Sequence, residues 1–266
     1  MIQSPKNLGF AEGNNLAIEH AKGELLLLIN NDTWVEKNFL EQLVEELHSR
    51  NLDVIGPREA DYITKAKRKK YSSHIDPLGH PVYLYDSEKP NFYLTGVCLL
   101  FKKSLYKEIG GFDSNFFMYC EEIDWFWRLQ MSNKKFAYSD EALVYHAGSG
   151  STGREINYPT FLWRNQNTLQ MLLKNYKHYN LVWVIPLYLS QNLLEMTAFL
   201  MIAKPKITIS YLQGIWFNVK HLPATLAKRK QIQKNRLVKN KEIFSKMYLG
   251  PGKALHLIQN LATKTE

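Results

Sequence analysis

Cysteine is scarce in this sequence, and a recognisable secretory signal is absent. The 266 residues contain two cysteines, Cys98 and Cys120, which lie too far apart for a Cys-x-x-Cys motif. Both have apolar or aromatic neighbours, so we expect reduced, structural thiols and a cytoplasmic protein. After Met1 there is no charged region followed by an apolar one, so no secretory leader is visible.

Acidic residues are nearly absent from residues 204–247, where eleven of the 34 Lys and Arg residues accompany a single acid, Glu242. The net charge of +9 therefore belongs to this segment. A basic tail suits nucleic acid or anionic lipid, and residues 181–203 decide between them because their only charge is Glu195. We expect an anionic membrane surface as a partner, and no nucleic acid.

Residues 181–203 are long enough to cross a bilayer, since at about 1.5 Å per residue they extend about 35 Å. A proline, two amides and a glutamate interrupt the apolar run, however. We favour helices that lie at the membrane surface, with Trp183, Tyr188 and Trp216 as interfacial anchors. A spanning helix and a buried helix pair in a soluble appendage are the alternatives.

Two nucleotide-binding fingerprints are incomplete. The glycine-rich run 148–153 lacks the Lys-Ser/Thr ending of a P-loop, and Gly9 with Gly13 falls short of a dinucleotide-binding motif. We interpret the run as a phosphate-contacting or mobile lid loop. The length and the 45% hydrophobic composition suit one α/β domain plus an appendage.

Hydrophobic periodicity predicts alternating helices and strands in the first half of the chain. Residues 13–22 have helical spacing with Gly23 as C-cap, and residues 25–29 are consecutively apolar. Such a run suggests a strand buried on both faces, as in a mostly parallel sheet flanked by helices, where ligands bind at the carboxyl ends of strands. Further helices are predicted at 39–47, from 104 and at 121–131, further strands at 54–57, 92–101, 136–138 and 142–145, and a long loop at 58–90.

Asn30, Asn31 and Asp32 follow the predicted strand 25–29 at the end where ligands bind. Oxygen ligands such as Asp32 suit Mg²⁺ or Mn²⁺, and the two amides could hydrogen-bond ribose or phosphate. An ordinary Asx turn explains the same three residues without a ligand. His146 closes the strand 142–145; Mn²⁺ tolerates an imidazole ligand, although a lone histidine there is usually structural.

Glu121, Glu122 and Asp124 lie in the first turn of the predicted helix 121–131. Acids at a helix N-terminus interact favourably with its dipole by about 0.3–1 kcal/mol, which is a sufficient structural reason for them. The aromatic residues on both sides would nevertheless place at least one carboxylate in a partly apolar cleft. Such a cleft raises a carboxyl pKa toward that of a useful base.

Taken together, these motifs resemble the bacterial inverting glycosyltransferases of family 2, nearest to the rhamnosyltransferase-like branch. The resemblance covers about residues 5–155. It is carried by Asn7-Leu8-Gly9-Phe10-Ala11-Glu12-Gly13-Asn14-Asn15, Asn30-Asn31-Asp32-Thr33, Thr95-Gly96, Lys102-Lys103, Gly110-Gly111-Phe112-Asp113, Phe116-Phe117, Glu121-Glu122-Ile123-Asp124, Arg128 and His146.

The resemblance implies a GT-A-type (Rossmann-like) sheet that binds a nucleotide diphosphate-sugar, and it implies a role for each motif. Asp32 would bind Mg²⁺ or Mn²⁺, His146 would contact the metal or the diphosphate, and Glu122 would be the base. Glu122 stands where Asp is usual, so Glu121 or Asp124 could replace it. Asn7, Gly9, Asn14 and Asn15 would line the nucleotide side, and Gly96, Gly111 and Asp113 would approach the sugars.

Members of this family begin with further strands that hold the nucleotide base, so we expect this chain to be truncated at its N-terminus. We expect a partial catalytic domain at 1–155 and a helical, basic, membrane-proximal tail at 156–266, attached peripherally to the inner face of the cell membrane. The predicted reaction is inverting, metal-assisted transfer of a hexose, with rhamnose as one candidate, to a lipid-linked or cell-surface glycan acceptor, as in cell wall or polysaccharide biosynthesis. A catalytically inactive, membrane-associated fragment is the main alternative, and a nucleotidyltransferase is the second.

Overall fold

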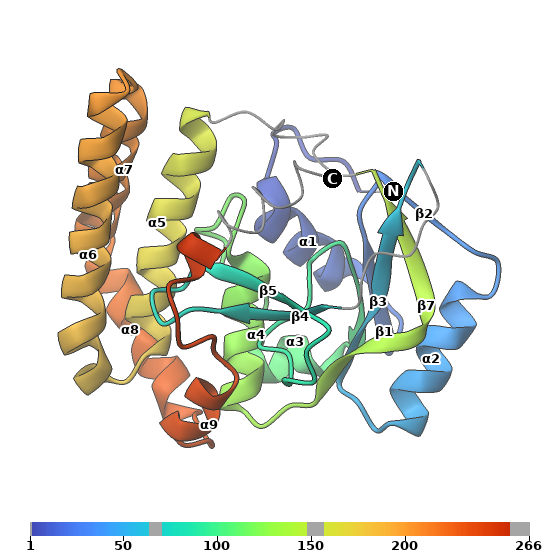
Figure 1. The fold of residues 1–266 in the computed structure, drawn as a ribbon. Coiled ribbons are helices and arrows are strands. Elements are labelled where there is room, and N and C mark those ends of the chain that lie inside the picture. Colours follow the sequence, from blue (N-terminus) through green and yellow to red (C-terminus); the bar gives the residue numbers. More distant parts are fainter. Residues whose placement is uncertain (1, 64–70, 148–156, 256–266) are drawn as a thin grey trace.

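The computed structural model describes residues 2–63, 71–147 and 157–255 (Figure 1). The glycine-rich run 148–153, interpreted above as a lid or phosphate loop, lies outside the described residues.

A five-stranded sheet forms the first part of the chain, in the order β1-β6-β3-β7-β2. β3 and β7 are parallel, whereas the other three neighbouring pairs are antiparallel. The predicted α/β class is therefore confirmed, but the sheet is mixed and not mostly parallel. Periodicity shows which residues of a strand are buried but not which way the strand runs. The strands are β1 (Leu25–Ile29), β2 (Thr33–Val35), β3 (Val54–Asp61), β6 (Cys98–Lys102) and β7 (Phe136–His146).

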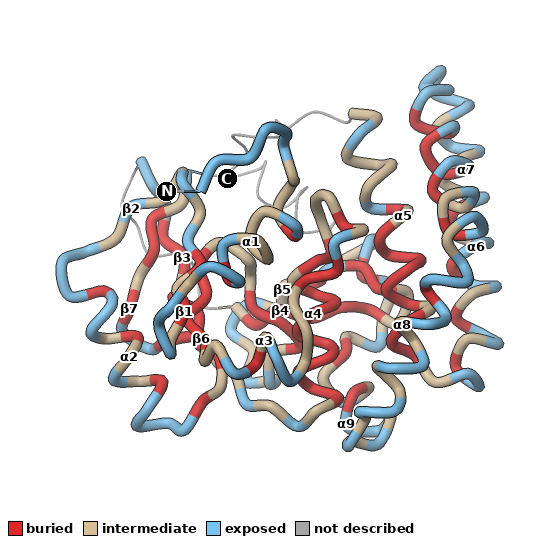
Figure 2. Tube along the Cα trace, turned by 180° about the vertical axis from the view of Figure 1, so that it is seen from behind, coloured by how far each residue is buried: buried red, intermediate tan, exposed pale blue. Residues whose placement is uncertain are grey.

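Helices cover both faces of this sheet, because alternate strand residues point to opposite sides. On β6, Leu99 and Phe101 belong to a hydrophobic cluster with α1 (Gly9–His20), α3 (Ser104–Ile109) and α4 (Glu121–Met131). Cys98 and Leu100 belong instead to a second cluster with α2 (Phe39–Ser49). Figure 2 shows these buried segments between the outer helices.

β1 is buried on one face and less completely on the other. Leu26 and Leu28 are buried, whereas Leu25 and Leu27 are half-buried and Ile29 is 43% exposed. Within the described sheet β1 has one hydrogen-bonded neighbour, β6, so less of it is covered than the prediction of a strand buried on both faces required.

The region 58–90, predicted to be a loop, contains regular structure at two places. β3 extends through this region as far as Asp61, and β4 (Tyr71–Ile75) pairs with β5 (Pro81–Tyr85) as an antiparallel hairpin. The sequence hid this hairpin because β4 buries polar residues: Ser72, Ser73 and His74 are 0–3% exposed.

The second half of the described chain is helical, as predicted, but it does not form a separate core. Leu172, Tyr176, Val184 and Tyr188 of this half belong to the same hydrophobic cluster as Trp127 of α4. In Figure 1 these helices stand at the side of α4 that faces away from β1 and α2. They are α5 (Tyr158–Asn175), α6 (His178–Met201), α7 (Pro205–Lys220), α8 (Leu222–Lys234) and α9 (Asn240–Ser245).

No helix among the described residues has both the length and the apolar character needed to cross a membrane.

Candidate active site

Asp32 and His146 lie side by side because β2 pairs with the end of β7. The strand register places Thr33 opposite His146, and the N–H of Ala147 donates a 3.1 Å hydrogen bond to the carbonyl of Asp32. His146 Nε2 is 3.3 Å from Asp32 Oδ2. The structure thus brings together the two residues that the sequence suggested as metal ligands.

Glu59 joins this pair, and sequence reasoning missed it. Its Oε2 lies 3.8 Å from His146 Nδ1, on the side of the ring opposite Asp32. Its Oε1 accepts hydrogen bonds from Thr95 Oγ1 (2.9 Å) and from Tyr71 Oη (3.1 Å). A carboxylate on one ring nitrogen orients a histidine so that the other nitrogen can serve a ligand.

Glu59 could have been recognised as a site residue if β3 had been predicted to continue beyond Pro57. The pairing with β7 shifts its register between Gly56 and Arg58 and then continues to Asp61. A proline at a register irregularity does not end a strand, because no ladder hydrogen bond needs its missing N–H there. Glu59 is 6% exposed, which is rare for a carboxylate without partners.

The donor set at this position fits a hard divalent cation that shares oxygen atoms with a substrate. Neighbouring ligands of an octahedral ion at about 2.1 Å are about 3 Å apart, close to the 3.3 Å between His146 and Asp32. Within residues 2–63, 71–147 and 157–255, no group of three or more His, Cys, Asp or Glu is arranged to hold a metal ion. Mg²⁺ is commonly held in proteins by one or two carboxylates together with phosphate oxygens, which is the kind of site two protein ligands can make.

Asn30 and Asn31 form the turn between β1 and β2. The N–H of Asn30 donates to the carbonyl of Val97 (3.0 Å), and its own carbonyl accepts from Thr33 Oγ1 (2.6 Å). Asn31 is exposed. The turn is therefore held by backbone groups and the Thr33 hydroxyl, and the exposed Asn31 lies next to Asp32 in the chain.

The turn before α4 is strained. Tyr119 and Cys120 have φ values of 73° and 69°, in the left-handed region that non-glycine residues seldom adopt. Asn167 of α5 stabilises this turn, because its Nδ2 donates to the carbonyls of Met118 (2.9 Å) and Tyr119 (2.8 Å). Strain of this kind costs about 1–3 kcal/mol per residue and is concentrated at functional sites.

Glu121 and Glu122 directly follow the strained turn and lie in an apolar environment. Burial raises the pKa of both carboxyls, and the neighbouring charge of Glu122 raises that of Glu121 further. Glu121 is 6% exposed, and its Oε2 has no hydrogen-bond partner among the residues that the structure describes. Glu122 is half-buried, and the positive charge of Arg164 opposes the increase in its pKa. Of the two, Glu122 is the carboxyl that solvent or a substrate can reach.

Gly96 connects the two halves of the site. A Cβ added at Gly96 would lie 3.7 Å from Glu122 Cβ and 3.2 Å from the Phe10 ring, so the loop approaches α4 closely. The preceding residue, Thr95, donates to Glu59. A continuous series of contacts therefore leads from Asp32 through His146 to Glu122.

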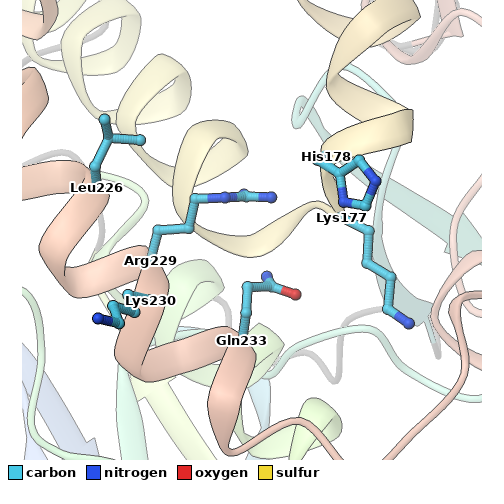
Figure 3. Close-up of a pocket in the computed structure, with 6 residues that line it drawn as sticks. All are labelled: Lys177, His178, Leu226, Arg229, Lys230 and Gln233. Atoms are coloured by element: carbon cyan, nitrogen blue, oxygen red, sulfur yellow. The ribbon is translucent and has the colours of Figure 1, made fainter.

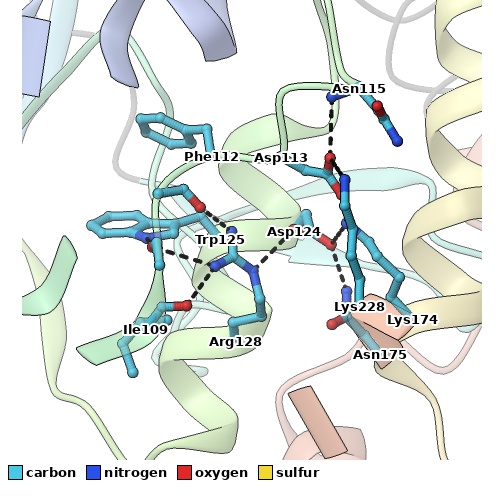
Figure 4. A network of polar contacts seen from close by, with 12 residues as sticks. Ile109, Phe112, Asp113, Asn115, Asp124, Trp125, Arg128, Lys174, Asn175 and Lys228 are labelled. Atoms are coloured by element: carbon cyan, nitrogen blue, oxygen red, sulfur yellow. Dashed lines mark hydrogen bonds and ion pairs between the residues drawn. The ribbon is translucent and has the colours of Figure 1, made fainter. Parts of the chain in front are cut away.

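Asp113 and Asp124 lie instead in a buried ionic network (Figure 4). Lys174 of α5 contacts both, with Nζ at 2.5 Å from Asp113 Oδ2 and 3.0 Å from Asp124 Oδ1. Lys228 of α8 also contacts Asp113 at 2.5 Å, and Arg128 contacts Asp124 at 3.0 Å. The Asp124 side chain is 0% exposed, so these contacts leave it no access to a substrate hydroxyl.

Burial alone would raise the pKa of Asp113, but Lys174 and Lys228 outweigh burial and hold that pKa below its ordinary value. Asp113 is therefore ionised at neutral pH and fastens its loop to the helical half of the chain.

The residues expected on the nucleotide side mostly fasten α1 to the loop before α4. Asn15 forms a pair of hydrogen bonds with the backbone of Phe112, donating through Nδ2 (2.8 Å) and accepting at Oδ1 (3.0 Å). A Cβ at Gly111 would lie 2.3 Å from Asn15 Oδ1, so a larger residue would displace the Asn15 side chain. Gly9, with φ of 70°, lets the chain approach the carbonyl of Phe117.

Asn7 and Asn14 make local contacts with the same helix. Asn7 Oδ1 accepts from the N–H of Gly9 (2.9 Å), and Asn14 Nδ2 donates to the carbonyl of Phe10 (2.8 Å). A role for these residues toward a nucleotide stays a prediction.

A separate basic pocket of about 480 Å³ lies between α8 and the first turn of α6 (Figure 3). Arg229 in this pocket donates to the carbonyls of Leu173 and Tyr176, so it satisfies the C-terminal end of α5. None of the residues described above lines the pocket. The residues that line it are Lys177, His178, Leu226, Arg229, Lys230 and Gln233.

Comparison with known proteins finds a family model that is similar to the first part of the chain. Residues 1–110 match the family model described as "Glycosyl transferase family 2". Over these residues the chain is similar to glycosyltransferase family 2. The matched residues contain Asp32, Glu59 and Gly96, and the predicted rhamnosyltransferase-like resemblance is confirmed by the relatives.

Two curated glycosyltransferases match parts of the chain. The N-acetylglucosaminyl-diphospho-decaprenol L-rhamnosyltransferase of Mycobacterium tuberculosis is 40% identical over 72 residues, which are 27% of this chain and 24% of the relative. The low-salt glycan biosynthesis hexosyltransferase Agl10 of Haloferax volcanii is 28% identical over 143 residues, 50% of this chain and 46% of the relative. The chain thus spans less than half the length of these relatives.

A solved structure confirms the GT-A fold. The crystal structure of GalNAc-T7 with UDP, GalNAc and Mn²⁺ aligns with 67% of this chain and 37% of its own, with a TM-score of 0.55 and 10% sequence identity. At that identity the likeness shows a shared fold, so the chain has a GT-A fold followed by helices.

Proposed function

We propose that this protein transfers a hexose, with inversion, from a nucleotide diphosphate-sugar to a hydroxyl group of a lipid-linked or cell-surface glycan acceptor. The observation that carries the proposal is the series of contacts from the Asp32–His146 pair through Glu59 and Gly96 to Glu122. The Asp32–His146 pair at one end of this series offers ligands for a cation, and Glu122 at the other end offers a carboxyl group of raised pKa. Transfer from a diphosphate needs both, because one bond breaks at the diphosphate while an acceptor hydroxyl loses its proton.

Asp32 and His146 are the residues that would hold Mg²⁺ or Mn²⁺. Such a cation, when bound, stabilises the negative charge that develops on the departing diphosphate. Glu59 keeps His146 oriented toward Asp32, and Asn30 and Asn31 are available to hydrogen-bond ribose or phosphate.

Glu122 is the proposed base. One of its carboxylate oxygens accepts the proton of the acceptor hydroxyl, whose oxygen then attacks the anomeric carbon on the face opposite the diphosphate. A single displacement of this kind inverts the configuration. Glu121 is more deeply buried than Glu122, and a raised pKa keeps it protonated over a wider pH range, which leaves Glu122 as the carboxylate that can act.

The names of the relatives support the choice of substrates. The mycobacterial relative is named for L-rhamnosyl transfer to a diphospho-decaprenol acceptor, and the archaeal relative is named a hexosyltransferase of glycan biosynthesis. The solved structure with UDP and Mn²⁺ supports a nucleotide donor and a divalent metal. On these grounds we propose rhamnose or another hexose as the transferred sugar, in cell wall or polysaccharide biosynthesis.

We also propose a cytoplasmic location with peripheral attachment to the inner face of the cell membrane, through the helical half at 156–266. The two cysteines are free and buried, and burial raises the pKa of each thiol to about 12. Such thiols stay unreactive in a reducing compartment. The basic segment 204–247 supplies charge for anionic lipid.

The test is release of nucleoside diphosphate and formation of a glycosylated acceptor, measured while Mn²⁺ or Mg²⁺ is titrated. We expect metal-dependent transfer by the protein and none by Asp32→Ala, with unchanged thermal unfolding because the turn tolerates alanine. Asp140→Ala is the matched control, since this side chain is 65% exposed and away from the site. Equal metal dependence in Asp32→Ala would refute the ligand role. Absence of transfer with every donor would favour the inactive fragment.

A further inference from the structure

The helical pair formed by α6 and α7 leaves an apolar face exposed, whereas helices of water-soluble proteins usually bury their apolar face and expose their polar face. On α6, two neighbouring rows of side chains point outward and are mainly apolar, with Ser190 and Thr197 as exposed polar members. Their large members are 37–83% exposed. They are Val182, Leu189, Leu193 and Leu200 in one row, and Trp183, Leu187, Leu194 and Met201 in the other.

α7 continues the same surface. Ile209, Leu212, Trp216 and Val219 recur at intervals of three and four residues, and they are 46%, 53%, 67% and 55% exposed. Side chains at this spacing share one face of a helix. Figure 1 shows α6 and α7 side by side at the outer edge of the molecule.

The inward faces of both helices combine apolar side chains, such as Val184 and Tyr211, with buried polar ones. On α7, Thr208, Ser210 and Asn218 are buried, and Asn218 Nδ2 donates to the carbonyl of Gln166 in α5 (2.9 Å). On α6, Asn192 is 2% exposed. Polar side chains that face the interior of a bundle while apolar ones face outward are the arrangement expected in lipid.

The charges of this region are placed at the margins of the apolar surface. Glu195, the acid of α6, turns inward, where Tyr211 Oη (2.5 Å) and Lys253 Nζ (2.6 Å) contact it. Lys204 and Lys206 stand at the turn between the two helices, and Lys220 closes α7; all three are exposed. Lysines beside an apolar surface reach toward anionic headgroups while their stems stay among apolar neighbours.

We propose that α6 and α7 insert their outer apolar face into the headgroup and acyl boundary of an anionic bilayer, lying parallel to its plane. This inference extends the peripheral attachment proposed above and is independent of the transfer chemistry. The inner faces stay packed on α5, so the bilayer replaces water on one side of the pair. Asn167 of α5 connects this docked helical half to the turn before Glu121 and Glu122.

The experiment is flotation of the full chain with vesicles of phosphatidylcholine alone or mixed equally with phosphatidylglycerol, at about 0.1 M salt, where the Debye length is about 10 Å. We expect binding to the mixed vesicles and at least tenfold weaker binding by Leu212→Glu. The matched control is Leu40→Glu on α2, because Leu40 is 50% exposed and Leu212 is 53% exposed. Binding of the control should equal that of the unmodified protein.

Tryptophan fluorescence tests insertion directly and does not depend on a disruptive variant. Trp216 is 67% exposed, so its emission should shift to the blue on addition of mixed vesicles and should be quenched by brominated acyl chains. Trp216→Phe should remove most of this change, whereas Trp34→Phe, which alters a residue 47% exposed on β2, should not.

Three outcomes would overturn the inference. Equal loss of binding in the Leu212→Glu and Leu40→Glu variants would remove the α7 face from the interface. Equal binding to neutral and mixed vesicles would remove the anionic requirement. The protein could also fail to bind vesicles and form a dimer in solution that Leu212→Glu abolishes. That result would show that a second copy covers this face. Transfer to a soluble acceptor should persist in Leu212→Glu, so failure of the proposed chemistry and failure of docking give different results.

Discussion

Replacing Lys174 by methionine should strongly destabilise the protein. Among substitutions in the helical half that keep the side-chain volume nearly constant, it should have the largest effect. The Lys174 side chain is 1% exposed, and its ammonium group lies between two carboxylates that are 4% and 0% exposed, those of Asp113 and Asp124. The Lys174→Met variant keeps the packing of the aliphatic stem but leaves both acids with less compensation.

The expected cost follows from the burial of all three groups. Breaking a buried ion pair by removing one partner costs about 3–5 kcal/mol, because the remaining charge is desolvated without its partner. Arg128 stays on Asp124 and Lys228 stays on Asp113, so we expect a value of about 3 kcal/mol, near the lower limit. Lys228→Met is the matched control, since that side chain is 38% exposed and its contact is screened by water, with an expected cost of about 1 kcal/mol or less.

The assay is equilibrium unfolding in urea at several pH values. The pKa of Asp113 is lowered in the folded protein, so its interactions stabilise the fold at pH values above the unfolded pKa of about 3.8 and are lost as the pH falls through the lowered folded pKa. In the Lys174→Met variant this lysine no longer opposes the effect of burial, so the protonated form of the Asp113 carboxyl is favoured. The difference in the free energy of unfolding between protein and variant should therefore be largest near pH 7 and should shrink toward pH 4. A cost below about 1 kcal/mol at pH 7, or one equal to that of Lys228→Met, would refute this account.

Three further predictions concern α4 and its support. Glu122→Gln should lower turnover by about a hundredfold or more with little change in donor binding, since general-base catalysis contributes a factor of about 10²–10⁴. A larger loss of turnover in Glu121→Gln would show that Glu122 is not the base. Because burial raises the folded pKa of Glu121, the wild-type protein should lose stability as the pH rises from 5 to 8, and Glu121→Gln should lose less in thermal melts over that range. Asn167→Ala should cost about 1–3 kcal/mol in urea unfolding, because the strained turn loses two hydrogen bonds, and Asn157→Ala provides a comparison with a simple helix cap; equal costs would mean that the turn needs no support from α5.

Asp32, His146 and Glu122 were within reach of sequence reasoning because each stands at the end of an element that periodicity predicts. The apolar run Leu25–Ile29 ends at the turn that contains Asp32, and β7 ends at His146. The aromatic residues around Glu122 indicated an apolar setting for it, and the structure buries that helix almost completely.

Glu59 and Asn167 were out of reach for different reasons. Glu59 follows a proline in a segment of polar composition, so nothing in the local pattern showed that β3 continues beside β7. Asn167 acts on a turn 48 residues away along the chain, through hydrogen bonds to the backbone of Met118 and Tyr119. The periodicity of a helix does not predict which backbone carbonyls will accept hydrogen bonds from its buried amide side chains.

The sequence by itself determined the α/β class, the order of the acidic and imidazole motifs, and a basic C-terminal half rich in apolar helix residues. These properties depend on composition and on local spacing, which a chain carries before it folds. Tertiary structure alone decided the direction of each strand, the use of Asp113 and Asp124 in a buried network, and the outward orientation of the apolar rows of α6 and α7. Those outcomes depend on which faces meet across long sequence separations, because an amphipathic helix has two faces and only its packing partners decide which of them is left exposed.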